Sequence, residues 1–165
     1  MKNQDVVVLS VLMGKSESSL SYQAISKAAK ISVSEVYASV KRLQGCDLLS
    51  LDRTIKKRNV EEFLLHGLRY AFPLKSTGEL AYGIPTSYAA PVSANEFAVS
   101  GNVPVWKSPN GKVLGRSCEP IYPTVPDAAA VNPGLYDCLA IIDMLRGGHL
   151  RERKFAERKI KELMK

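Results

Sequence analysis

Two short helical patterns lie close together between Ser21 and Arg42, and they constrain the fold more than any other stretch of the chain. In each pattern, apolar residues recur three or four positions apart, which places them on one face of a helix. Ser21 and Ser32 each stand just before a pattern, where a hydroxyl can accept a hydrogen bond from the first turn. Glu35, three residues after Ser32, fits a capping box. Two short helices joined by a tight break predict a helix-turn-helix.

Each helix of this pair is expected to bury one apolar stripe in a shared core. The first stripe consists of Tyr22, Ile25, Ala28 and Ala29, and the second of Val33, Val36, Tyr37, Val40 and Leu43. The opposite face of the second helix then carries small polar residues at its start and cations at its end. A DNA-reading helix needs this division, because backbone contacts position the protein and base-edge contacts specify the sequence. A plain amphipathic helix pair inside a core is the alternative interpretation.

The candidate DNA-binding residues follow from this division. The residues expected at base edges, with Tyr37 belonging either to the groove face or to the core, are Ser32, Ser34, Glu35, Tyr37 and Ala38. The residues expected to contact phosphates are Lys41, Arg42, Arg53, Lys56, Lys57 and Arg58. The last four lie in the segment 52–59, where a winged-helix domain would carry its β-wing. This segment is too short for a full two-stranded wing, so it is predicted to form a reduced wing or a basic connector. An ordinary exposed loop is the alternative, although four cations in six residues repel one another unless an anion is near.

The charge of the chain is concentrated at its two ends. The formal net charge is +7, and the sequence pI is about 9.4. Residues 1–72 carry 11 basic and 7 acidic side chains, residues 73–145 carry 4 and 6, and residues 146–165 carry 8 and 3. Basic ends around a slightly acidic middle indicate a polyanionic partner that the ends contact.

The remaining segments predict an α+β chain. A first helix is expected over Gln4–Lys15, and a further helix, with a clear apolar stripe, over Val60–Phe72. Eight prolines between residues 73 and 126 exclude long helices there. The strands expected in this region, in a small irregular antiparallel sheet, are Leu80–Ile84, Val103–Trp106, Lys112–Cys118 and a fourth candidate, Ser87–Ala90. The turn residues Pro109-Asn110-Gly111 predict a hairpin between the second and third of these strands. A last helical region is expected to open at Asp127, with a helix that begins at the Asn132-Pro133 cap and a final helix over His149–Lys165.

Sequence motifs for catalysis and metal binding are absent. The chain has no G-x-S-x-G, H-E-x-x-H, Walker or G-x-G-x-x-G motif, and its two histidines and three cysteines lack metal-ligand spacing. No enzyme activity and no cofactor or metal are therefore expected. The chain has three cysteines, an odd number, which predicts a reduced, cytoplasmic protein. It has no long apolar run, so no membrane segment is expected. An aromatic set of Trp106, Tyr82, Tyr88 and Tyr122 is expected to anchor the sheet, with a small-molecule pocket among them as the alternative.

The stretch SYQAISKAAKISVSEVYASVKRLQGCDLL resembles the winged helix-turn-helix of MarR-like bacterial transcriptional regulators. The resemblance covers about residues 4–52. It rests on Ala24-Ile25, on Ser32 to Val36, and on Arg42-Leu43 with Leu48-Leu49. The usual long β-wing is missing at its expected place. The ending LYDCLAIIDMLRGGHLRER resembles chains encoded beside nucleotidyltransferase-like toxins, which implies an antitoxin role.

The sequence therefore predicts an N-terminal winged helix-turn-helix over residues 1–72 and a β-rich and helical part over residues 73–165 that dimerises or binds a partner. The expected function is that of a sequence-specific double-stranded DNA-binding regulator of transcription, a repressor acting as a homodimer on a palindromic site. Two alternatives stay open. The first is an antitoxin that represses its own operon and binds a toxin protein. The second is a regulator that responds to a small molecule.

Overall fold

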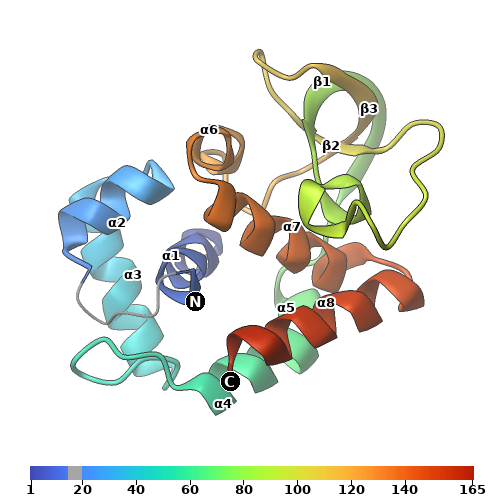
Figure 1. Cartoon of the computed structure of the whole chain (residues 1–165). Helices are drawn as coiled ribbons and strands as arrows, with labels where there is room; N and C mark the ends of the chain where they lie inside the picture. The colour runs from blue at the N-terminus through green and yellow to red at the C-terminus, as the bar shows by residue number, and fades with distance from the viewer. Residues whose placement is uncertain (15–19) are drawn as a thin grey trace.

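The structure, a computed structural model, has the α+β organisation expected from the sequence and describes residues 1–14 and 20–165. The helices are α1 (Asn3–Met13), α2 (Tyr22–Ala29), α3 (Val33–Gly45), α4 (Lys57–Glu62), α5 (Leu68–Ala71), α6 (Val125–Val131), α7 (Pro133–Gly147) and α8 (Leu150–Leu163). The strands are β1 (Ser76–Pro85), β2 (Pro104–Lys107) and β3 (Val113–Cys118). Figure 1 shows α2 and α3 at one end of the molecule, the strands at the other, and α1 and α7 between them.

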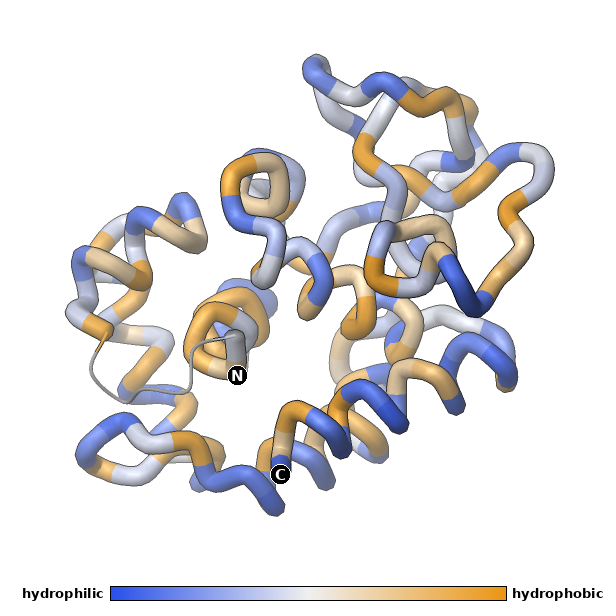
Figure 2. The backbone as a smooth tube through the Cα atoms, viewed as in Figure 1, coloured by the Kyte–Doolittle hydropathy of each residue, from blue (hydrophilic) through white to orange (hydrophobic). Residues whose placement is uncertain are grey.

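Helix α1 lies at the centre of the molecule and is buried on all sides. Every residue from Asp5 to Met13 is buried, and four of the valines and leucines are fully inaccessible. In Figure 2 this helix is mostly orange and is surrounded by other elements. The sequence predicted one apolar face and a helix as far as Lys15. The burial is instead uniform, the helix ends at Met13, and Lys15 lies outside the described residues. An all-round apolar helix of this kind is typical of a core position.

Helices α2 and α3 begin at the two serines that the sequence identified as caps. The Ser21 hydroxyl accepts a hydrogen bond from the Ala24 backbone N–H at 3.1 Å. The Ser32 hydroxyl likewise accepts from the Glu35 backbone N–H at 3.3 Å. Helix α2 ends at Ala29, and the next residue, Lys30, adopts the left-handed conformation (φ 56°), which allows the chain to turn sharply into α3. The helical pair and its tight break are therefore confirmed as structural elements.

The loop between α3 and α4 folds back on itself in a minimal hairpin. Leu49 and Ile55 form an isolated antiparallel bridge, and the Ser50 backbone N–H donates to the Thr54 carbonyl at 2.9 Å. We call residues 50–54 the tip turn. The predicted segment 52–59 is thus divided between this turn and the first residues of α4.

The helix predicted over Val60–Phe72 begins earlier and contains a π-helical turn. It runs from Lys57 to Ala71, with a π-helical segment, η1 (Phe63–Gly67), between α4 and α5. Val60, Leu64 and Leu68 are buried, whereas Ala71, which belonged to the predicted stripe, is exposed. The wider π turn explains this difference, because an extra residue in one turn rotates the following residues around the helix axis.

The sheet is mixed, and the predicted hairpin between β2 and β3 is wrong. β1 pairs antiparallel with both β2 and β3, so β2 and β3 run in the same direction and pair in parallel, closing the three strands into a small barrel. The fourth candidate strand, Ser87–Ala90, is also wrong, since Ser87–Ala89 forms a 3₁₀ turn, η2. The turn after β2 passes over β1: the Ser108 backbone N–H donates to the Tyr82 carbonyl at 3.2 Å, and Gly111 lies directly against Gly83.

A methyl group at Gly83 is expected to destabilise this barrel. A Cβ placed there would lie 2.2 Å from the backbone oxygen of Trp106, so the paired strands would have to separate. Gly83→Ala should lower the free energy of unfolding by about 2 kcal/mol, the usual cost of overpacking. Chemical denaturation measures this change. Gly45→Ala is the matched control, because a Cβ at Gly45 meets nothing within 4 Å. An equal loss in both variants would contradict the close approach of β1 and β2.

A buried polar cluster attaches the barrel to α7. One carboxylate oxygen of Asp143 accepts the indole N–H of Trp106 at 2.7 Å and the hydroxyl of Thr86 at 2.8 Å. The other oxygen accepts from Nη1 of Arg146 at 2.6 Å, and Nε of Arg146 donates to the Phe72 carbonyl at 2.8 Å. Each of these groups has its partner in the interior, as buried polar groups require. The cluster joins β2, α7 and the end of α5.

One apolar cluster extends through both predicted halves of the chain. It includes Leu9 of α1, Val40 of α3, Leu68 of α5, Ile142 of α7 and Ile160 of α8. The packing is therefore continuous across residue 72, where the sequence suggested a domain boundary. In the described part of the chain, every helix is too short or too polar to cross a membrane.

Candidate nucleic-acid interface

The solvent-facing side of α3 carries most of the side chains that the sequence assigned to base edges. Ser32 and Ser34 are exposed, Tyr37 is 50% exposed, and Glu35 and Ala38 are half-buried. The buried side consists of Val36, Ser39, Val40 and Leu43. Two residues of the predicted apolar stripe lie outside the core, since Val33 is 44% exposed and Tyr37 faces solvent. Ser39, which was not part of the predicted stripe, is buried as well.

The first turn of α3 presents a set of hydroxyls held in place by hydrogen bonds. The Ser32 hydroxyl lies 3.2 Å from the Ser34 hydroxyl and 3.0 Å from a carboxylate oxygen of Glu35. The Glu35 carboxylate therefore bonds to the capping hydroxyl, whereas a capping box would direct it to the backbone N–H of Ser32. This arrangement orders the three side chains before any partner binds.

A row of aromatic rings and cations crosses from the tip turn to α3. The guanidinium of Arg53 lies over the Tyr22 ring at 4.9 Å, and the Tyr22 and Tyr37 rings meet edge to face with centroids 5.5 Å apart. The ammonium of Lys41 lies 5.5 Å from the centroid of the Tyr37 ring. Exposed cation–π contacts contribute about 0.5–1 kcal/mol each. The row therefore fixes the positions of Tyr37 and Lys41 on the outer face of α3.

Arg42 has a structural role, which changes the phosphate-binding role predicted for it. Its Nε and Nη2 groups donate to both carboxylate oxygens of Asp5 in α1 at 2.6–3.1 Å, and Nη2 also donates to the Ser39 hydroxyl at 3.0 Å. The Asp5 side chain is fully buried and that of Arg42 is 27% exposed. Burial acts to raise the pKa of Asp5, but the hydrogen bonds from Arg42, the Lys2 backbone and Ser39 outweigh it and hold the pKa below its ordinary value. Arg42 thus holds α3 against the central helix.

Arg53 is likewise engaged within the protein. Its Nη1 donates to the carbonyl of Leu20 at 2.9 Å, and its guanidinium packs on Tyr22. Its backbone adopts the left-handed conformation (φ 71°) within the tip turn. Arg53 therefore anchors the tip turn to the start of α2, and the phosphate contact predicted for it is replaced by this contact.

Three further predicted cations lie at the start of α4 with different surroundings. Lys56 forms an ion pair with Asp47, which holds the pKa of that carboxyl below its ordinary value. Arg58 pairs with Glu62 one turn later at 3.3 Å and is 90% exposed. Lys57 is exposed on the first turn of the helix. Exposed pairs of this kind are weak, so Lys56 and Arg58 can exchange their carboxylates for phosphates.

Sequence reasoning missed two exposed cations and one anchoring amide near α3. Lys27 and Lys30 lie on the exposed surface of α2, next to the break that precedes α3. Gln44, in the last turn of α3, donates from its side-chain nitrogen to the carbonyls of Ser50 and Leu51, both at 3.1 Å. The basic residues were visible in the sequence as a cationic last turn of α2. The Gln44 contacts depend on the loop conformation and had no sequence signal.

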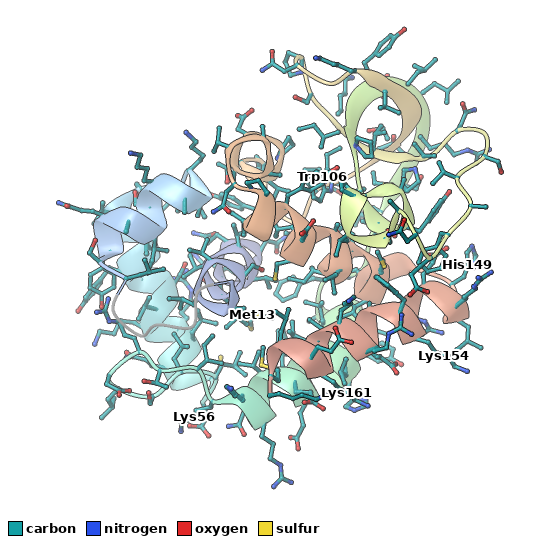
Figure 3. All side chains as sticks on the ribbon, in the orientation of Figure 1. Met13, Lys56, Trp106, His149, Lys154 and Lys161 are labelled. Carbon is teal, nitrogen blue, oxygen red and sulfur yellow. The ribbon has the colours of Figure 1, made fainter. Side chains whose placement is uncertain are left out.

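The aromatic set was expected to anchor the sheet, and the place of the alternative, a pocket among these rings, is filled by the protein itself. Trp106, labelled in Figure 3, is fully buried and bonded to Asp143, and its ring packs on Tyr136 with centroids 5.8 Å apart. Tyr82, by contrast, is 61% exposed on the outer face of the barrel. A cavity of about 370 Å³ lies elsewhere, between α7 and α8, with Val92, Cys138, Ile141 and Leu163 among its lining residues. Within residues 1–14 and 20–165, groups of three or more acidic, histidine or cysteine side chains suited to a metal ion are absent.

Comparison of the chain with protein-family models, with curated proteins and with solved structures finds no match in any of the three.

Proposed function

We propose that this chain binds double-stranded DNA through α3 and regulates transcription. The observation that carries the proposal is the outward face of α3. There, the hydrogen-bonded hydroxyls of the first turn are followed by the exposed ring of Tyr37 and the exposed side chain of Lys41. A recognition helix in the major groove contacts base edges mainly through its N-terminal residues. The α2–α3 pair and the short loop after α3, in the place of a wing, support a reduced winged-helix arrangement.

The charge distribution supports the same proposal. Lys27 of α2, Lys30 just after it, Lys41 of α3 and Lys57 of α4 are exposed. Figure 1 shows α2, α3 and the tip turn at one end of the molecule, and α4 leads from that end towards the C-terminus. Arg42 and Arg53 hold this end in shape. We therefore assign the phosphate contacts to Lys41, Lys56, Lys57 and Arg58, together with Lys27 and Lys30.

Selection of bound duplexes from a random pool, at low and moderate salt, tests the proposal directly. A regulator should enrich one sequence at both salt concentrations, because base contacts persist after the phosphate contacts weaken. Enrichment without a consensus would indicate non-specific binding only. Failure to retain duplex DNA at low salt would contradict the proposal.

Substitution of Lys41 and Ser34 should separate positioning contacts from base contacts. Lys41→Ala should weaken binding to all duplexes alike and reduce the salt slope by about one unit, because one phosphate contact is lost. Ser34→Ala should change the preferred sequence and leave the salt slope unchanged. Both side chains are exposed, so the fold should remain intact in each variant. Identical effects of the two substitutions would contradict this division of roles.

The DNA-bound form is proposed to be a homodimer. Helix-turn-helix proteins bind two half-sites about 34–36 Å apart, and the symmetry of the site follows that of the protein. Sedimentation of the complex with a selected duplex gives the number of chains bound. A palindromic consensus with two chains per duplex is the expected result, whereas one chain on a single half-site would contradict the dimer.

A second candidate function, binding of a protein partner, is favoured by the outer face of the barrel. Tyr82 and Leu114 are cross-strand partners on β1 and β3 and are 61% and 47% exposed, and Leu80 on the same face of β1 is 51% exposed. Figure 1 shows this barrel at the end of the molecule away from α3. A partner bound there would leave the DNA-binding face accessible, as the antitoxin alternative requires. Co-purification of a toxin with the wild-type chain, and its loss with Tyr82→Ser, would support this function.

A further inference from the structure

Helix α8 carries a straight row of cations on its solvent-exposed side. Each member lies three or four positions after the one before, so the side chains share one face of the helix. The members of the row, all exposed, are Arg151, Lys154, Arg158, Lys161 and, just past the end of the helix, Lys165. Ala156 and Ile160, on the opposite side of the helix, are fully buried. We call the five cations the α8 row; Figure 3 labels Lys154 and Lys161 within it.

The carboxylates of α8 leave much of this row without a partner. Glu152 accepts a hydrogen bond at 3.0 Å from the backbone N–H of His149, at the start of the helix. Glu162 pairs at 3.1 Å with Lys159, which lies outside the row. Among the described residues, the members of the row with no carboxylate within 4.0 Å are Lys154, Lys161 and Lys165. Like charges three or four residues apart destabilise a helix, so the row does not contribute to the stability of α8 by itself.

The two arginines of the row are held by a neighbouring loop. Arg158 pairs with the Glu96 carboxylate at 2.7 Å, and the two side chains are 54% and 47% exposed. The Arg151 guanidinium lies 5.6 Å from the centroid of the Phe97 ring and donates to the Glu96 carbonyl at 3.4 Å. An exposed ion pair of this kind contributes little, so Arg158 can exchange its carboxylate for a phosphate. The loop therefore orders both arginines and leaves them accessible.

The shape and composition of the row fit the phosphate backbone of duplex DNA. From Arg151 to Lys161 it extends over about 15 Å, at about 1.5 Å of rise per residue. One DNA strand places about four phosphates along that length. A membrane surface fits less well, because the apolar side of α8 is buried in the protein and cannot insert between lipids. A protein partner also fits less well, because lysine is depleted at protein–protein interfaces.

We propose that the α8 row is a second DNA-binding surface, which contacts the phosphates of duplex DNA without regard to sequence. This inference goes beyond the function proposed for α3, because it needs no base contact and no particular sequence. Phosphate contacts add affinity for any duplex and carry no sequence information directly. The row would hold the chain on DNA whether or not the preferred sequence of α3 is present.

The test measures binding of the full-length chain to a duplex of random sequence over a series of salt concentrations. The row variant combines Lys154→Gln, Lys161→Gln and Lys165→Gln, which removes three positive charges and keeps residues that favour a helix. Its slope of log affinity against log salt should be smaller by about three units, because each lost phosphate contact reduces the slope by about 0.9. The corresponding triple substitution by arginine keeps the charges and should keep the wild-type slope.

The matched control removes the same charge from the other end of the molecule. Lys75, Lys107 and Lys112 are exposed on or beside the barrel strands, and all three are replaced by glutamine. This variant should keep the wild-type slope, because the α8 row is intact. Equal decreases in the row variant and the control would overturn the inference, since they would show an effect of net charge alone. A wild-type chain that binds phosphatidylserine vesicles and no duplex would overturn it as well.

Selection from a random pool distinguishes the α8 row from the outward face of α3. The row variant should enrich the same sequence as the wild type, because the base contacts assigned to α3 are unchanged. A changed consensus would overturn the inference, since the row would then take part in reading the sequence. If the wild type enriches no sequence and the two slopes still differ by about three units, the α8 row is supported and sequence-specific regulation fails.

Discussion

Asp143→Ala should lower the free energy of unfolding by about 4 kcal/mol, the largest effect that we expect from a single substitution in this chain. The change leaves the Arg146 guanidinium, whose side chain is 4% exposed, without its carboxylate. It also removes the acceptor for the Trp106 indole N–H and the Thr86 hydroxyl, both buried. A buried charge and two buried donors without partners are among the costliest changes in a protein interior. Denaturant titration followed by tryptophan fluorescence measures the change, since Trp106 is the single tryptophan.

Asp137→Ala provides the control on the same helix. Asp137 is half-buried, and burial raises the pKa of its carboxyl above the ordinary value. Its removal should therefore change stability by less than about 0.5 kcal/mol, as for most substitutions away from special contacts. The double substitution Asp143→Leu with Arg146→Met should cost less than Asp143→Ala alone, because it leaves neither charge unpaired. Similar losses for Asp143→Ala and Asp137→Ala would contradict the role of the buried cluster.

Arg42→Ala should lower the free energy of unfolding by about 3 kcal/mol at pH 7, because it leaves the Asp5 carboxylate buried without its partner. Lys41→Ala, one position earlier on the same helix, should leave stability nearly unchanged, since Lys41 is exposed. The pair therefore separates a residue that maintains the fold from one to which we assign a contact with DNA. Thermal or denaturant unfolding of the two variants is the measurement. A stable Arg42→Ala variant with weakened DNA binding would instead restore a direct phosphate contact for Arg42.

The loss of unfolding free energy caused by Arg42→Ala should be smaller at acidic pH than at pH 7. In the wild type the pKa of Asp5 is lowered, so the stability that its ion pair provides is present above the ordinary pKa of about 4 and is lost as the pH falls through the lowered value. In the variant, the Asp5 carboxylate is buried without a partner, and this cost to stability disappears once the carboxyl is protonated and neutral. The difference between the two free energies should therefore be smaller at pH 4 than at pH 7. A difference that is independent of pH would show that Arg42 stabilises the protein through packing alone.

Local signals in the sequence predicted the starts of helices well. Ser21, Ser32 and Asn132 each accept the hydrogen bond expected of a cap, and Pro133 begins α7 as expected. Such caps are recognisable because the donor and acceptor are only three residues apart. The strand direction was not predictable in the same way. Pro109-Asn110-Gly111 is typical of a hairpin turn, but the turn crosses β1, and this depends on the contact of Gly111 with Gly83, nearly thirty positions away.

The same distinction applies to the candidate site. The outward face of α3 could be predicted from helical spacing, which identified Ser32, Ser34 and Lys41 as exposed. The engagement of Arg42 could not, because Asp5 is 37 positions away and nothing near it in the sequence marks a partner. Val33 and Tyr37 fitted the apolar stripe equally well in spacing. Only the packing of Tyr22 against Tyr37 at the surface places that ring outside the core.

The central position of α1 has a consequence for how this chain can be divided. Because Val6, Val7, Val8 and Leu9 are fully covered, and their cover comes from both ends of the sequence, a fragment of residues 1–72 would present this helix to water. We therefore do not expect residues 1–72, which carry α3, to fold independently when they are fused to another protein. Recombination or truncation near residue 72 should yield an insoluble polypeptide, and any functional hybrid would have to inherit α7 and α8 as well.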